Sequence, residues 1–278
     1  MPGFMGKMMI LLAALSCHRV QPDSHSTTTT NPGQSESWGL QGPLSPPPRL
    51  RTAPKVRLPS VTSKMPVLST WDFLTKLNHN QMAALKSYLD LGKDKKVNHR
   101  SLNECTMLLT EKLSCRSADP KFISTVKQKC ESLAQAWNVL PKSSGVIFRG
   151  INKASIEEIY RLEEARSQCS LISLGEANQP SWISGTRDSD VAVYFTQRGT
   201  KDANVYKIFY QIKQRNGIAV ERASEYPNER EVLISPTSQF RVVSLSPVEG
   251  TNNLLLAEVE EALTMYDLKR LEQKSCTN

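Results

Sequence analysis

Apolar residues recur at helical spacing between residues 70 and 140. A Ser69–Thr70 cap predicts a first helix that ends at Gly92, and a second helix is expected from Ser101 to Leu113. Asp119–Pro120 predicts the start of a third helix. Its apolar side chains lie three or four positions apart: Phe122, Val126, Cys130, Leu133 and Trp137. Such stripes are typical of helices that pack into a core, so we expect no chemistry from this region.

From Val146 onward, runs of strand length rich in apolar and β-branched residues replace the helical stripes. We expect strands at residues 146–150, 181–186, 204–213, 217–221, 231–235, 239–246 and 254–259. A Ser155-x-x-Glu158 capping box predicts a helix to about Ser167, and a short helix is expected to start at Asp188 or Ser189. Many short strands with few helices between them predict an α+β fold with antiparallel sheets.

Residues 1–68 differ in composition from the rest, because they hold 10 of the 16 prolines and are rich in Ser and Thr. Such a stretch buries too little apolar surface to offset the entropy lost on ordering, so we expect a disordered leader. Its apolar run Met8–Leu15 is far shorter than the roughly 20 residues of a transmembrane helix. The run fits a signal peptide, with Cys17 as a lipoprotein-type variant, while the whole leader fits the export signal of an injected protein.

The leader carries seven basic and two acidic side chains, and therefore +5 of the formal net charge of +8. Nucleic acid is not an expected partner, because the strand-rich part has no basic stripe interleaved with aromatic residues. All four histidines precede Arg100, which excludes a histidine metal site in that part. Six cysteines without a Cys-x-x-Cys pair indicate free buried thiols in a reducing compartment.

Candidate chemistry lies where polar side chains meet the predicted strands. A strand would point Glu229 and Glu231 the same way, which is costly unless they share a proton or a ligand. Arg149 ends a buried strand, where it needs an anion and could grip a phosphate. Ser184 and Thr186 place two hydroxyls on one side of another strand. Each piece alone has a plain alternative, such as a solvated strand start for the glutamates or a solvent-exposed strand end for the arginine.

Together, these pieces resemble the R-S-E clade of mono-ADP-ribosyltransferases, which contains cholera-toxin-like, C3-like and actin-modifying bacterial toxins and many injected effectors. The resemblance rests on Arg149, on Ser184–Gly185–Thr186 preceded by Trp182, and on Tyr226-x-x-Glu229-x-Glu231, in that order. It covers about residues 142–260. The family more often has Thr at position 185. The absence of histidine from the first strand excludes the diphtheria-like clade.

The resemblance implies a core of two packed, mainly antiparallel sheets and an N-terminal helical subdomain. We accordingly divide the chain into a leader with an export signal (1–68), a helical subdomain (69–141), a catalytic core (142–260) and a C-terminal tail (261–278). NAD is implied as the co-substrate, with no metal.

The resemblance also assigns roles around NAD. Arg149 would hold the phosphate and ribose end, and the backbone of Gly150 would approach the nicotinamide amide. Ser184 and Thr186 would orient Glu231. Glu231 would bond the ribose 2′-hydroxyl and stabilise the positive charge that develops as the glycosidic bond breaks.

On the acceptor side, Glu229 would position or deprotonate the target residue and Tyr226 would contact it. Phe195 could line the pocket or belong to the core. The implied function is transfer of ADP-ribose to a protein of a host cell by a secreted or injected bacterial effector that acts in the host cytosol. The alternatives are an NAD glycohydrolase and a non-catalytic interaction module. A Glu at position 229 leans towards arginine as the acceptor, while asparagine, cysteine and the threonine of ubiquitin stay open.

Overall fold

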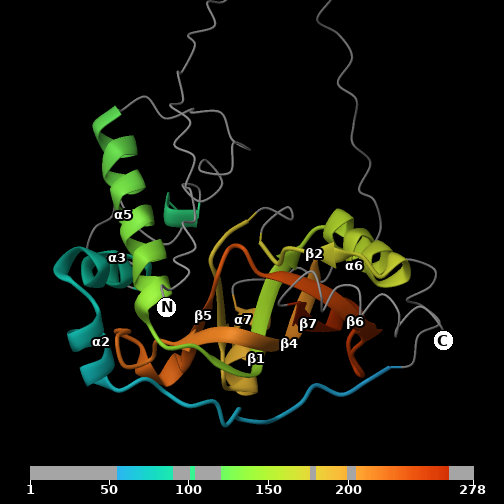
Figure 1. Ribbon diagram of the computed structural model, residues 1–278. Coiled ribbons are helices and arrows are strands. Elements are labelled where there is room, and N and C mark those ends of the chain that lie inside the picture. Colours follow the sequence, from blue (N-terminus) through green and yellow to red (C-terminus); the bar gives the residue numbers. More distant parts are fainter. Residues whose placement is uncertain (1–54, 90–100, 104–119, 176–179, 199–204, 263–278) are drawn as a thin grey trace, which may run out of the picture. The chain divides into compact units, whose positions relative to one another are not determined.

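The computed structural model describes residues 55–89, 101–103, 120–175, 180–198 and 205–262. It has an α+β fold with mainly antiparallel strands, which confirms the predicted class (Figure 1). The predicted signal segment, residues 263–278 of the predicted C-terminal tail and most of the second predicted helix lie outside the described residues, whereas Glu261 and Ala262, assigned to that tail, belong to a strand. The helices are α2 (Thr70–Lys76), α3 (His79–Leu89), α5 (Pro120–Val139), α6 (Ile156–Gln168) and α7 (Ser189–Gln197). The strands are β1 (Ser143–Ala154), β2 (Leu171–Ile172), β3 (Ile183–Thr186), β4 (Tyr206–Ala219), β5 (Glu231–Ile234), β6 (Gln239–Pro247) and β7 (Leu254–Ala262).

The first predicted helix is two helices, α2 and α3, separated at Leu77 and Asn78. Ser69 caps α2 as expected, in a reciprocal capping box with Asp72. The break follows from a second reciprocal pair, because the backbone N–H of Gln81 donates to Oδ1 of Asn78 and the N–H of Asn78 donates to Oε1 of Gln81. An Asn-x-x-Gln pair of this kind marks a helix start, so a new helix begins inside one apolar stripe.

Seven strands are hydrogen-bonded in the order β1-β3-β5-β4-β7-β6-β2, and β1 also pairs with β4. Strands β1, β3, β5 and β4 therefore close a ring, and β7, β6 and β2 extend the sheet from β4. All pairs are antiparallel except β4–β7. The two expected sheets are thus joined through β4. Helix α7 packs on β1, and α6 packs on β6 and β2 (Figure 1).

Strand β4 runs unbroken through a stretch that the sequence analysis assigned to a gap between two strands. The register opposite β1 shifts here, so the backbone needs partners beyond the ladder. The buried carboxylate of Glu261 accepts the backbone N–H groups of Arg215, at 2.6 Å, and of Asn216, at 3.2 Å. A contact from 45 residues away thus keeps the strand continuous.

The helices α2, α3 and α5 share an apolar core with the strands. This core includes Val126, Cys130 and Leu133 of the predicted stripe on α5, together with Trp182, Ile218 and Leu233 from the strand region. A second core lies under α6 and contains Ile147, Ile159 and Phe240, and a third contains Phe148, Ala192 and Phe209. The ring of strands is therefore covered by helices whose positions depend on it.

Residues 55–68, which the sequence analysis assigned to the disordered leader, are ordered against the strands. Val56 forms a parallel bridge with Val248, and Thr62 an antiparallel bridge with Asp188. Met65 is 4% exposed and belongs to the core under α6. The boundary predicted near Leu68 was wrong, because hydrogen bonds and one buried side chain order a segment whose composition alone suggests disorder.

Of the two cysteines in the described residues, Cys130 is a buried thiol outside any disulfide and Cys169 is disulfide-bonded. The expectation of cysteines outside disulfides holds for Cys130 and fails for Cys169. Cysteine usage is therefore no argument for a reducing compartment.

Candidate active site

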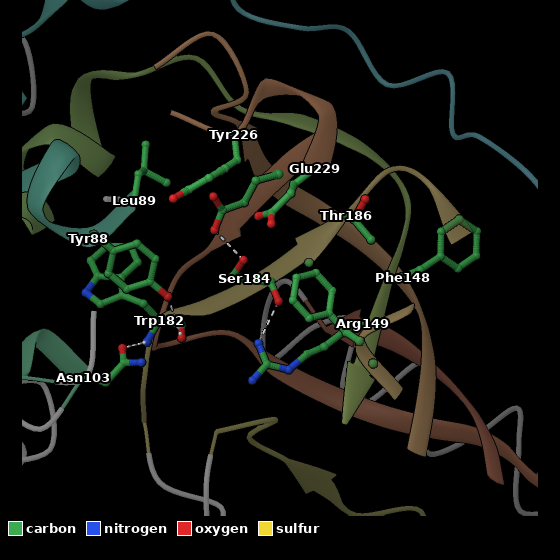
Figure 2. Close-up of a pocket in the computed structure, with 14 residues that line it drawn as sticks. Tyr88, Leu89, Asn103, Phe148, Arg149, Trp182, Ser184, Thr186, Tyr226 and Glu229 are labelled. Carbon is green, nitrogen blue, oxygen red and sulfur yellow. Dashed lines mark hydrogen bonds between the residues drawn. The ribbon is translucent and has the colours of Figure 1, made fainter. Parts of the chain in front are cut away.

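A cavity of about 280 Å³ opens where β1, β3, α7 and the start of β5 meet the end of α3 (Figure 2). Every residue that the sequence analysis assigned to the site lines it: Arg149, Gly150, Ser184, Thr186, Phe195, Tyr226, Glu229 and Glu231. Residues up to 82 positions apart in the chain are thus brought together by the ring of strands. The cavity is near the lower end of the roughly 300–1,000 Å³ typical of small-molecule sites.

Arg149 lies on β1, and its guanidinium points across the adjacent strand β3 (Figure 2). Its Nη1 donates to the carbonyl oxygen of Ser184 at 2.7 Å. Its Nε is buried and has no hydrogen-bond acceptor among the described residues. A partly buried guanidinium at the wall of the cavity is suited to bind an anionic group that enters it.

Ser184 and Glu231 meet across the pairing of β3 with β5. The Ser184 hydroxyl donates to Oε1 of Glu231 at 2.5 Å. The pKa of Glu231 is raised to about 7, chiefly by burial and to a smaller extent by the charge of Glu229, although the bond from Ser184 and the charge of Arg149 both lower it. The serine and the arginine thus both favour the carboxylate form of a group that burial would protonate.

Glu229 reaches the cavity from a turn and not from a strand, contrary to the sequence analysis. Pro227–Glu229 forms a 3-10 turn, Arg230 adopts the left-handed conformation at φ 48°, and β5 begins only at Glu231. Both carboxylates still line the cavity. The sequence analysis expected them on one side, but because both would lie in the same strand. Partial burial raises the pKa of Glu229, and the positive charge of Arg198 counteracts this.

Thr186 has a different contact from the one expected. It is the register partner of Glu231, but its hydroxyl oxygen accepts the backbone N–H of Asp188 at 3.0 Å. Asp188 in turn caps α7. The Thr186 hydroxyl therefore secures the start of α7, while the Ser184 hydroxyl contacts the carboxylate.

The two glycines of the site are required by neighbouring chain segments. A β-carbon at Gly150 would lie 2.1 Å from the carbonyl oxygen of Ala192 on α7, so the backbone of α7 fills the space expected for a ligand. A β-carbon at Gly185 would lie 2.7 Å from Cδ1 of Ile147. Cδ1 is the end of a flexible side chain, so this contact constrains position 185 less than the backbone of α7 constrains position 150.

Aromatic side chains surround the opening. Tyr226 is 49% exposed and precedes the turn that carries Glu229. Phe195 is half-buried and has an edge-on contact with the exposed Tyr194. The opening therefore combines a carboxylate with an accessible aromatic ring, which together suit a cationic group.

Sequence reasoning missed four lining residues: Tyr88, Leu89, Asn103 and Phe148. The hydroxyl of Tyr88 donates to the carbonyl oxygen of Trp182 at 3.2 Å, and Oδ1 of Asn103 accepts the N–H of Trp182 at 2.9 Å (Figure 2). The helical part thus holds the chain two residues before Ser184. Burial and the charge of Glu231 both raise the pKa of Tyr88, which places its hydroxyl in the field of that carboxylate. Tyr88 and Leu89 belong to a helix whose apolar spacing is typical of an ordinary core, and nothing in the sequence marks Asn103 or Phe148 as site residues.

Among the described residues, no cluster of three or more His, Cys, Asp or Glu side chains is arranged to hold a metal ion. No helix of the described ranges is long and apolar enough to cross a membrane.

The family model for NAD:arginine ADP-ribosyltransferases matches residues 99–264, which is more than half of the chain. A comparison with curated protein sequences found no significant match. Among solved structures, the ADP-ribosyltransferase HopU1 of Pseudomonas syringae pv. Tomato DC3000 is similar, with 20% identity and a TM-score of 0.47 over 66% of this chain and 76% of that one. Exoenzyme S from Pseudomonas aeruginosa has 16% identity and a TM-score of 0.47 over 74% and 89%. The C3 exoenzyme of Clostridium limosum has 12% identity and a TM-score of 0.45 over 69% and 90%.

Proposed function

The chain belongs to the NAD:arginine ADP-ribosyltransferase family, and on this basis we propose that it transfers ADP-ribose from NAD to a protein side chain and releases nicotinamide. The observation that supports this most strongly is the bond between Ser184 and Glu231 at the cavity that Arg149 also lines. A carboxylate and a cation that line the same cavity are the two groups that the reaction needs on the protein side.

The side chains that line the cavity match the phosphates and the planar rings of NAD. The guanidinium of Arg149 at the cavity wall can bind a phosphate oxygen, and the aromatic walls suit a planar ring. Bound NAD supplies an ADP-ribosyl group on a positively charged leaving group. Glu231 bonds the ribose and stabilises positive charge there, while Ser184 keeps its carboxylate oriented and ionised.

Glu229 and Tyr226 act on the acceptor. The raised pKa of Glu229 makes its carboxylate a better base, and its place in an exposed turn lets a bulky target approach. Carboxylate and aromatic ring together favour a guanidinium, so arginine is the acceptor that we propose. We further propose that the protein is a secreted or injected bacterial effector that modifies a host protein.

The test is an assay with NAD labelled in its ADP-ribose part and nicotinamide measured in parallel. We expect nicotinamide release in buffer, faster release with agmatine as a small guanidine acceptor, and label on protein in a cell lysate. Release that neither acceptor accelerates would instead indicate an NAD glycohydrolase. Absence of NAD binding would indicate a non-catalytic module.

A further inference from the structure

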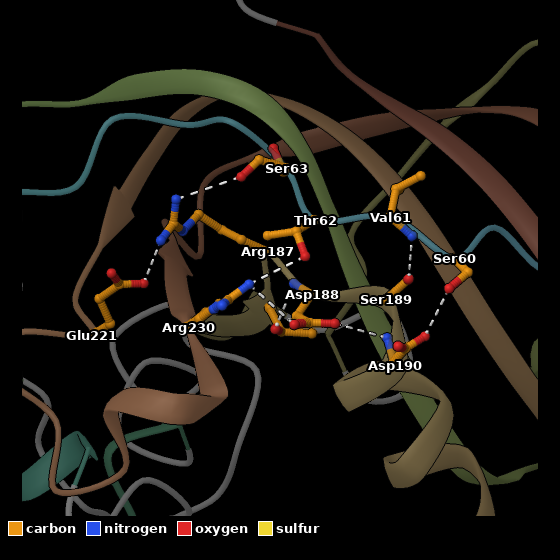
Figure 3. Close-up of polar contacts among 11 residues, drawn as sticks. Ser60, Val61, Thr62, Ser63, Arg187, Asp188, Ser189, Asp190, Glu221 and Arg230 are labelled. Atoms are coloured by element: carbon orange, nitrogen blue, oxygen red, sulfur yellow. Dashed lines mark hydrogen bonds and ion pairs between the residues drawn. The ribbon is translucent and has the colours of Figure 1, made fainter.

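The segment from Lys55 to Met65, here called the N-terminal strap, is bonded to the chain that directly follows the Ser184–Thr186 strand (Figure 3). The backbone of Val61 is bonded twice to Ser189: its N–H donates to Oγ at 2.8 Å and its carbonyl accepts the N–H at 3.1 Å. The N–H of Ser63 donates to the carbonyl oxygen of Arg187 at 2.7 Å. The strap thus behaves as a short extra strand beside residues 187–189.

Arg230 connects this strap to the turn that carries Glu229. Its Nη1 donates to Oγ1 of Thr62 and to Oδ2 of Asp188, both at 3.1 Å (Figure 3). Its carbonyl oxygen accepts the backbone N–H of Arg187 at 3.1 Å, and its own N–H closes the turn on Pro227. One residue therefore joins the strap, the start of α7 and the turn.

A second arginine holds the far end of the strap. Nη1 of Arg187 donates to the carbonyl oxygen of Met65 at 2.8 Å, and Nη2 pairs with Glu221 at 2.6 Å. Met65 itself is buried against Gly145 and Gln214. Because both ends are held, the backbone of the strap is anchored where Thr62 contacts Arg230.

The two glutamates of the site depend on Arg230 to different degrees. Glu231 lies in β5, where the pairing with β3 and the hydroxyl of Ser184 hold it. The carboxylate of Glu229 has no hydrogen bond to any described residue, so its position depends on the backbone of the turn. That turn requires Arg230 in the left-handed conformation, which is unfavourable for a residue with a β-carbon.

We propose that Arg230 is a positioning residue for Glu229, and that the strap is the fixed support on which it acts. This inference rests on the proposed function of Glu229 towards the acceptor. The contacts of its guanidinium with Thr62 and Asp188 offset the backbone cost and hold the turn ready. Without them, the turn samples other conformations, and transfer to the acceptor is lost while cleavage of NAD continues.

The test compares full-length Arg230→Gln with the wild type in two reactions, transfer to agmatine and nicotinamide release without acceptor. We expect kcat/KM for agmatine to fall by about tenfold or more and release to change by less than about threefold. Arg230→Lys keeps a charged donor at the same backbone cost and should recover part of the transfer. Thr62→Val should lower transfer by a few fold. The matched control is Arg222→Gln. Arg222 is an exposed arginine of the preceding turn, and it forms no ion pair with any described residue. This change should alter neither reaction.

Amide hydrogen exchange provides the second measurement. Exchange at Glu229 and Arg230 should accelerate in Arg230→Gln, whereas Val232 and Leu233 in β5 should keep their protection. Equal loss of both reactions, or unchanged transfer with unchanged exchange, would overturn the proposal. If the wild type neither transfers nor releases nicotinamide, the proposed function fails, and the exchange experiment still decides whether Arg230 holds the turn.

Discussion

At the scale of single residues, the main feature of the site is the ionisation of Glu231. Burial favours its neutral form, whereas its proposed role requires the carboxylate. Its pKa is raised to about 7 in the free protein, so a sizeable fraction is protonated at neutral pH. Only the carboxylate form stabilises positive charge on a ribose. We therefore expect kcat/KM for nicotinamide release to increase with pH through about 7, because this parameter reports the ionisation of the free enzyme.

Ser184→Ala should move this profile to higher pH. The hydroxyl favours the charged form of Glu231, so its loss raises the pKa of the carboxyl further. The variant should lose most activity below pH 7 and recover part of it near pH 9, in an assay of nicotinamide release from pH 5 to 9.5.

Ser244→Ala is a matched control, because it removes a similar bond from a serine to Glu258 on β7. It should leave the profile unchanged. If Ser184→Ala lowers the rate equally at every pH, its hydroxyl does not act through the ionisation of Glu231.

Arg149→Lys keeps the charge but loses the planar fork. The change removes the paired N–H groups with which a guanidinium binds a phosphate at two points, so we expect the Kd for NAD to rise by about tenfold or more. The melting temperature without NAD should change by a few degrees at most, since a lysine can still reach the carbonyl of Ser184. Calorimetric titration with NAD measures the first quantity, and unchanged affinity would remove Arg149 from the site.

At the scale of elements, the packing of α7 on β1 shapes the cavity. Gly150→Ala would place a methyl group against the backbone of α7, at Ala192 and Thr196, which cannot move independently of the helix. We expect a loss of roughly 1–3 kcal/mol in the free energy of unfolding and a weaker affinity for NAD. Urea unfolding of Gly150→Ala and the wild type measures the loss, and an unchanged free energy of unfolding would contradict this packing argument.

Elements were predictable from sequence where local signals determine them. The caps Ser69, Ser155 and Asp188 start helices in the structure as their spacing predicts. That β4 is one unbroken strand could not be predicted from the local sequence, because it depends on a contact with the distant Glu261. The turn before Glu231 was also missed, since a non-glycine residue in the left-handed conformation leaves no signature in composition.

At the scale of the whole molecule, the site extends beyond the strands that carry its motifs. The ordered triple of Arg149, Ser184 and Glu231 made the cavity predictable, because each residue lies on its own strand of a closed ring. Tyr88 and Asn103 were not predictable in the same way, because only the tertiary packing of the helices brings them to Trp182. The helices and the strap are therefore parts of the enzyme that the motifs do not reveal.

Truncation tests this conclusion. The composition alone suggests that removal of residues 1–68 leaves a folded and active protein, whereas the contacts of residues 55–68 predict that this deletion is less stable than one of residues 1–54. The longer deletion removes Met65, and deletion of a buried methionine side chain typically costs about 2–5 kcal/mol. Melting temperatures and nicotinamide release of the two truncated proteins should therefore differ. Equal values would show that the strap contributes nothing.

The most direct test of the whole account is the comparison of Glu231→Gln with Glu229→Gln in the two reactions. Both changes preserve shape, and both residues line one cavity. Glu231→Gln should abolish nicotinamide release and transfer together. Glu229→Gln should lower transfer to agmatine by the roughly 10²–10⁴-fold typical of a general base, and lower release to water much less. If Glu229→Gln eliminates release as completely as Glu231→Gln does, or leaves transfer intact, the division of roles between the two carboxylates is contradicted.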